Sequence, residues 1–95
     1  MLTKQKVKYY FSLTEKALKK IKVKKPKIKD YKKLAEEYLK ISNCYYDDAK
    51  HFYKKGDLVN AFAAINYSHA FLDAGAILGI FDVGKKDSKL LMIDK

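Results

Sequence analysis

The sequence predicts an all-α protein, a three-helix bundle built on an antiparallel helical hairpin. Three observations lead to this fold class. One Pro and four Gly in 95 residues leave few residues that interrupt helices. Apolar residues recur at steps of three and four along much of the chain. Residues 54–58, KKGDL, combine a helix stop with a helix start, which indicates a tight turn between two helices.

The first helix is expected over residues 3–22, with Thr3 as its N-cap. Its apolar stripe consists of Val7, Phe11, Thr14, Leu18 and Ile21. Pro26 and the lysines around it interrupt helical structure, so residues 23–29 are expected to form a connection.

The second helix is expected over residues 30–55, where Asp30 can cap the first turn. Its apolar positions follow a near-heptad spacing: Tyr31, Leu34, Tyr38, Ile41, Tyr45, Ala49 and Phe52. Gly56 can take the left-handed conformation that ends this helix, and Asp57 can cap the next.

The third helix, expected over residues 57–81, contains no lysine, and Asp73 is its only charge after Leu58. Because it is apolar nearly all round, we expect it to be covered on nearly all sides. The first two helices would supply two walls, and the tail or a second copy of the chain a third. We expect one domain over residues 1–83 and a tail over 84–95 that is either docked or disordered.

The third helix is long enough to span a membrane, but Asp73 would then lie in the apolar layer. We therefore expect no membrane span. The N-terminus has no apolar run typical of a signal peptide, and Cys44 is the only cysteine, so a cytoplasmic location is expected.

The positive charge is concentrated in the N-terminal third. Residues 1–33 hold 13 of the 21 lysines but only two acidic residues, Glu15 and Asp30. Clustered positive charge can bind nucleic acid or another polyanion. The complete absence of Arg disfavours specific base recognition. The candidate polyanion patch lies within residues 16–33: Lys19, Lys20, Lys22, Lys24, Lys25, Lys27 and Lys29.

Metal binding and catalysis are not expected. If the turn is centred between Gly56 and Asp57, Cys44 lies level with His69 and Lys40 level with Asp73. Cys44 and His69 give two ligands with no third in register, so we predict no metal and no cofactor. Ser68 adjoins His69, but neighbouring residues on a helix point apart, which leaves no nucleophile and base pair there. His69 is expected to be a hydrogen-bonded core residue, and Asp73 to pair with Lys40 or a tyrosine hydroxyl.

The segment AKHFYKKGDLVNAFAAINYSHAFLDAGAILGIFDV, residues 49–83, resembles the hallmark of a small archaeal family known only as domain of unknown function 357. The resemblance covers about residues 5–83. It implies a compact helical bundle in an archaeal cytoplasm and supplies no catalytic residues. The residues that match the family pattern are Gly56, Asp57, Asn60, Ala61, Asn66, Tyr67, His69, Asp73, Gly75 and Gly79.

The leading functional hypothesis is a small interaction module that acts through homo- or hetero-association and has no catalytic activity. Self-association as a dimer, or a protein partner, is expected because the third helix must be covered. The candidate interaction surface lies on the third helix: Asn66, Tyr67, His69, Phe71, Asp73, Ala74, Gly75 and Leu78. The alternative is an accessory protein that binds a polyanion through residues 16–33.

Overall fold

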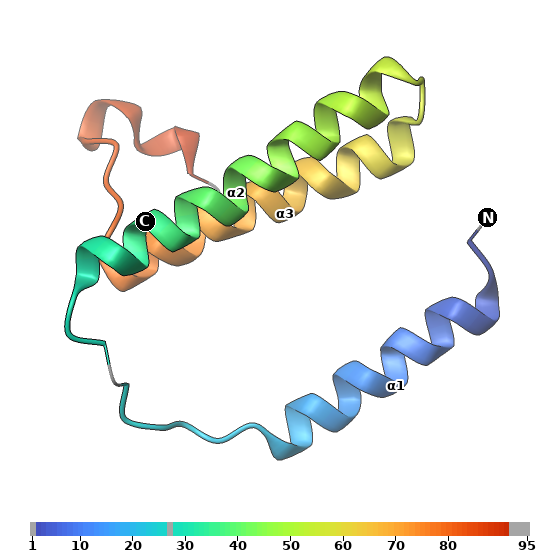
Figure 1. The fold of residues 1–95 in the computed structure, drawn as a ribbon, viewed down its shortest axis with the longest axis horizontal. Helices are drawn as coiled ribbons and strands as arrows, with labels where there is room; N and C mark the ends of the chain where they lie inside the picture. The colour runs from blue at the N-terminus through green and yellow to red at the C-terminus, as the bar shows by residue number, and fades with distance from the viewer. Residues whose placement is uncertain (1, 27, 92–95) are drawn as a thin grey trace.

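The computed structural model describes residues 2–26 and 28–91. It contains three α-helices, α1 (Lys4–Lys20), α2 (Tyr31–Lys54) and α3 (Leu58–Leu78), and a 3-10 helix, η1 (Lys85–Leu90). Helices α2 and α3 lie side by side as an antiparallel hairpin, and α1 lies apart from them (Figure 1). The described residues contain no strand. The prediction of an all-α fold built on a helical hairpin is therefore confirmed.

The predicted caps begin each helix. The Thr3 hydroxyl accepts a hydrogen bond from the backbone N–H of Lys6 at 3.1 Å. The Asp30 carboxylate accepts from Lys32 N at 3.0 Å and Lys33 N at 3.4 Å. Each cap satisfies N–H groups that have no partner inside the helix, so these helices start where local sequence places the capping residue.

Two glycines in the left-handed conformation end α2 and α3. Gly56 has φ +79° and Gly79 has φ +81°. At the first, Asp57 N donates to Phe52 O, and at the second, Ile80 N donates to Gly75 O, both at 2.9 Å. These six-residue closures are Schellman motifs, which satisfy the last carbonyls of a helix. Helix α3 consequently ends at Leu78, three residues earlier than predicted.

Small residues form the seam between α2 and α3. The buried residues of the hairpin helices are Ser42, Ala49, Ala61, Ala64, Ser68 and Gly75. Small side chains let two helix backbones approach closely, but they bury little apolar area. Among the described residues no large side chain is fully buried. The seam therefore fixes the geometry of the hairpin without covering its larger apolar side chains.

A reciprocal pair of serines locks the middle of the seam. Ser42 Oγ donates to the carbonyl oxygen of Ser68 at 2.9 Å, and Ser68 Oγ donates to the carbonyl oxygen of Ser42 at 2.8 Å. The two hydroxyl oxygens are 3.0 Å apart. Each hydroxyl has one hydrogen, which these carbonyl bonds use. The pair sets the register of α2 against α3.

After Gly79 the chain turns back on the hairpin. The ring of Phe81 lies against Gly75, in the space that a β-carbon on Gly75 would occupy. Phe81 also meets Tyr38 edge to face, with ring centroids 6.5 Å apart. Gly75 is therefore required for packing, because any side chain there would displace Phe81.

Helix α1 contacts neither α2 nor α3, which corrects the expectation that it forms one wall around the third helix. Each of its residues is exposed. The radius of gyration is 16.1 Å, compared with about 12 Å for a compact domain of this length. An extended connection over residues 21–30, described except for Lys27, separates α1 from the hairpin (Figure 1).

The expectation that the third helix is covered on nearly all sides is also wrong for the single chain. Only four of the 21 residues of α3 are buried, since α2 alone of the described helices packs against it. The tail forms η1 as far as Leu90, which is 56% exposed. The tail residues Met92 and Ile93 lie outside the described residues.

Candidate interaction surface

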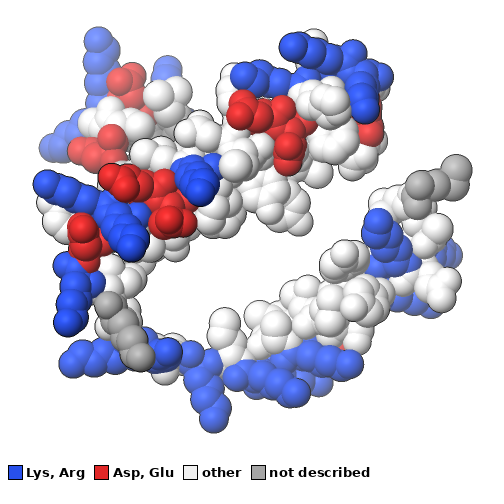
Figure 2. All heavy atoms as spheres, in the orientation of Figure 1, with Lys and Arg blue, Asp and Glu red and all other residues white. Residues whose placement is uncertain are grey.

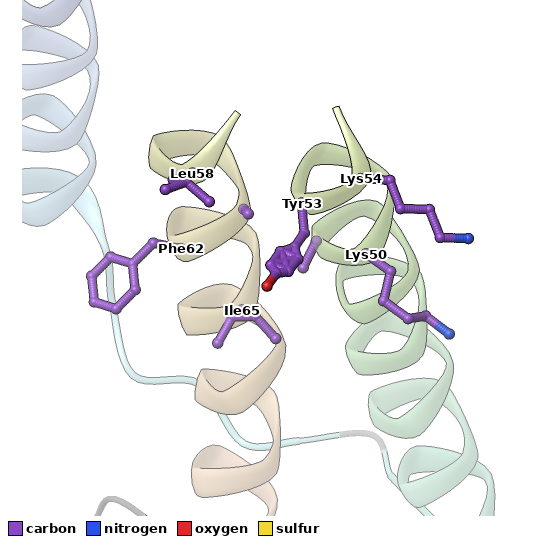
Figure 3. Close-up of a pocket in the computed structure, with 8 residues that line it drawn as sticks. Lys50, Tyr53, Lys54, Leu58, Phe62 and Ile65 are labelled. Carbon is purple, nitrogen blue, oxygen red and sulfur yellow. The ribbon is translucent and has the colours of Figure 1, made fainter. Parts of the chain in front are cut away.

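An apolar groove runs along the hairpin near its turn (Figure 3). Its volume is about 740 Å³. It is lined by Ala49, Lys50, Tyr53, Lys54, Leu58, Ala61, Phe62 and Ile65. Tyr53 points into the space between the helices, whereas the ammonium ends of Lys50 and Lys54 point away from α3 (Figure 3). The groove therefore presents carbon surface, with positive charge only at its α2 edge.

Helical spacing brings the α3 side of the groove together. Leu58, Phe62 and Ile65 follow steps of four and three, so they share one face. Phe62 is 69% exposed, Leu58 64% and Ile65 39%. Phe62 projects away from α2, so its ring has no partner within the hairpin (Figure 3). This cluster was not among the predicted interaction residues, although its spacing and lack of charge could have identified it.

The predicted interaction surface is divided by the fold. Tyr67 and Leu78 are exposed at 58% and 54%, on the side of α3 opposite to Phe62. Asn66 is exposed as well, and Ala74 is half-buried. These four residues are available to a partner.

The other members of the predicted surface serve the hairpin itself. Phe71 packs on two aromatic rings of α2, at 5.6 Å from Tyr38 and 6.3 Å from Tyr45. Gly75 is buried beneath Phe81. Tyr45 also stacks on Tyr67 at 5.2 Å, so Tyr67 contributes one face of its ring to the fold and leaves the rest exposed.

His69 and Asp73 form a pair within α3. His69 Nε2 lies 3.6 Å from Asp73 Oδ1, and both side chains are partly exposed. The Nε2 atom is buried and makes no hydrogen bond among the described residues. His69 is thus a half-buried residue beside a carboxylate rather than the hydrogen-bonded core histidine that the sequence suggested.

Cys44, paired with His69 in the predicted register, is an exposed free thiol. The register itself agrees with the structure to within about one turn, since Ser42 faces Ser68 and Tyr45 faces Tyr67. Among the described residues, no group of three or more His, Cys, Asp or Glu side chains is placed to hold a metal ion.

The apolar stripe of α1 forms a second uncovered surface. Val7, Phe11 and Leu18 are exposed at 37%, 66% and 71%. Figure 2 shows mostly uncharged atoms on the side of α1 that faces the hairpin, and lysines on its outer side and near its N-terminal end. The helix is therefore amphipathic, and its apolar side meets an open space.

The candidate polyanion patch is exposed on α1 and the connection. Its described members are Lys19, Lys20, Lys22, Lys24, Lys25 and Lys29, all exposed. Lys27 lies outside the described residues. In Figure 2 this end of the molecule carries mostly positive charge, while the acidic residues gather on the hairpin.

The turn contains a carboxyl group, that of Asp57, with a lowered pKa. The pKa of Asp57 lies below 3.8, chiefly because the Asn60 side-chain amide donates to it, and also because of the Asn60 backbone N–H and the charge of Lys55. The two hydrogen bonds measure 2.6 Å and 3.2 Å. This arrangement explains why Asp and Asn occur together after the glycine.

No helix in the described part of the chain is both long and apolar enough to cross a membrane. The fold and its surfaces define a small protein based on a helical hairpin, with a small-residue seam and with uncovered apolar surfaces on both α1 and the hairpin.

The chain belongs to the family described as "Protein of unknown function (DUF357)", whose model matches residues 9–81. The resemblance found in the sequence is thereby confirmed. No curated protein and no solved structure matches the chain.

Most residues that match the family pattern have a structural role in this fold. Gly56 and Gly79 end helices, and Gly75 receives Phe81. Asp57 and Asn60 form the cap of α3, and Ala61 lies in the seam. The pattern therefore describes how the hairpin is built, and Asn66 is the member for which the structure gives no such role.

Proposed function

We propose that this protein is an interaction module that works by association, as a homodimer or with a protein partner, and has no catalytic activity of its own. One observation supports this most directly: the hairpin closes on small residues and leaves several large apolar side chains of α3 exposed on two opposite sides. The family resemblance supports an archaeal, cytoplasmic setting.

The amount of exposed apolar surface supports association with another molecule rather than packing of α1 on its own hairpin. Phe62 lies on one side of α3, and Tyr67 and Leu78 lie on the other. Helix α1 is the only free amphipathic α-helix among the described residues, and a single helix can cover only one of these sides. Exposed apolar surface on both sides is typical of a chain that binds another molecule.

Sedimentation velocity over a range of concentrations tests the proposal. We expect a concentration-dependent dimer that weakens in Phe62→Asp and in Leu78→Asp, which place a charge on each side of α3. Asn43→Asp, on an exposed position of α2, is the matched control and should associate normally. A chain that stays monomeric at high micromolar concentration, and purifies from its native cytoplasm without a partner, contradicts the proposal.

A second candidate function is polyanion binding, favoured by the exposure of every described lysine in the patch. Binding to duplex DNA, single-stranded DNA and RNA should then fall steeply as salt rises. Neutralising Lys22, Lys24 and Lys25 to Gln should weaken it. The control is the same change at Lys85, Lys86 and Lys89, three exposed lysines of η1. Absence of binding at low salt rules this function out.

A further inference from the structure

We propose that the groove of one copy is filled by α1 of a second copy, so that two chains exchange their first helices reciprocally. The inference rests on the self-association proposed above and names the contact that produces it. The exchanged contact joins the α1 stripe around Val7 and Phe11 to the groove around Phe62 and Ile65.

The two surfaces match in chemistry. The stripe and the groove are both apolar, and both are uncovered in the single chain. Over most of α1 the lysines lie on its outer side (Figure 2), and Lys4 and Lys8 flank the stripe beside Val7 and Phe11. The ammonium groups of Lys50 and Lys54 point away from α3 (Figure 3). Docking therefore buries carbon against carbon and leaves these charged groups in water, which avoids the penalty of burying an unpaired charge.

Helix α1 is also short enough to lie along α3, beginning in the groove. Helix α1 has 17 residues and α3 has 21, about 25 Å and 31 Å long. A helix of this length can lie along the hairpin from the turn towards Gly75. A specific interface buries about 800 Å² on each partner, and reciprocal exchange forms the same helix contact twice.

The connection favours exchange over closure within one chain. The described residues between 21 and 30 form no helix. The segment contains Pro26 and the lysines at 22, 24, 25, 27 and 29. Like charges along a linker repel one another and extend it, and proline biases the residue before it towards extended structure. An extended connection keeps α1 away from its own hairpin and within reach of another, which is the arrangement that favours exchange of an element between copies.

Disulfide trapping between two different single-cysteine chains tests the exchange. In a Cys44→Ser background, one chain carries Phe11→Cys with one affinity tag, and the other carries Ile65→Cys with a second tag. The two are unfolded together, refolded and oxidised. No disulfide within a chain is possible, so a covalent heterodimer carrying both tags reports contact between copies.

We expect the Phe11→Cys and Ile65→Cys mixture to give at least several-fold more heterodimer than a mixture of Lys16→Cys with Ile65→Cys. Lys16 lies on the opposite side of α1 and provides the rate of random collision. A second pair, Val7→Cys with Phe62→Cys, gives the same readout if the first pair folds poorly, as judged by circular dichroism.

Each outcome has a defined meaning. Equal yields from stripe and control mixtures overturn the exchange. A further Cys44→Ser chain carries both Phe11→Cys and Ile65→Cys. If this chain forms a disulfide as a covalent monomer and the two-chain mixture gives no stripe-specific heterodimer, the exchange is also overturned and the contact lies within one chain. If sedimentation still shows a dimer in either case, the proposed self-association stands and only its mode is wrong; a monomer at all concentrations removes both.

Discussion

Helices α1 and α2 are both amphipathic, both capped by a side-chain oxygen, and yet only α2 is packed. Helix α2 lies against α3 through Ser42 and Ala49, whereas no residue of α1 is buried. Caps and helix propensity therefore determine where a helix forms in the chain, whereas packing requires a complementary surface within reach. The same kind of substitution should therefore change the stability of the protein more in the hairpin than in α1.

The largest contrast is expected between two phenylalanines. Phe71→Ala removes a ring packed on Tyr38 and Tyr45 and should lower the free energy of unfolding by about 3 kcal/mol. Phe11→Ala, the same change on α1, should alter it by less than about 0.5 kcal/mol in dilute solution, where chains are monomeric. Urea unfolding followed by circular dichroism measures both. Equal losses at high dilution would show that α1 packs on its own hairpin.

Larger side chains in the seam between α2 and α3 should destabilise the protein. Ser42→Leu places a branched side chain between two close backbones and removes a hydrogen bond to Ser68, so we expect a loss of about 2–3 kcal/mol. Asn43→Leu adds the same side chain at the next, exposed position and should change stability by about 0.5 kcal/mol or less. Similar losses in both variants would mean that the seam is looser than its hydrogen bonds indicate.

The effect of Gly75→Ala on the free energy of unfolding should change sign when Phe81 is removed. With Phe81 present, Gly75→Ala forces the ring out of place and should destabilise the protein by about 1–2 kcal/mol. In a Phe81→Ala background the same substitution should stabilise by up to about 1 kcal/mol, because alanine favours helix over glycine. A double-mutant cycle of unfolding free energies checks this. Additive effects would contradict the contact between the two residues.

The smallest expected effect is the loss of stability at low pH that comes from Asp57. The pKa of Asp57 is lower in the folded chain than its ordinary 3.8, so this carboxylate adds stability above that pH. The contribution disappears as the pH falls through the lowered pKa. Asp57→Asn keeps a capping oxygen but cannot titrate, and should lose less stability than the natural chain on acidification. Unfolding midpoints at neutral pH and below pH 3.8 provide the test; parallel losses would exclude this role for Asp57.

Local signals predicted the helices well because their causes lie within a few residues. Thr3, Asp30, Asp57 and Gly56 each act on N–H or carbonyl groups close in sequence, and each was identified from its position beside an apolar run. The hairpin register followed from the turn, since a helix has a fixed rise per residue. The early end of α3 depends on Gly79 and on the return of Phe81, which local periodicity does not report.

Which surface packs on each apolar helix face could not be predicted from the same local signals. Periodicity identifies the apolar side of α1 but contains no information about which molecule covers it. The seam was not predicted either, because Ser68 was considered only as a nucleophile beside His69, and Ser42 lies outside the apolar stripe of the second helix. Their spacing with Ala49, Ala61 and Ala64 is the signal that would have placed them between the helices.

The serine and alanine seam also has a thermodynamic consequence. A hairpin that closes on hydroxyl and methyl groups gains little from leaving water, so with the association proposed here its stability depends on the second molecule. By mass action, dilution then destabilises the folded chain, and its melting temperature rises with protein concentration.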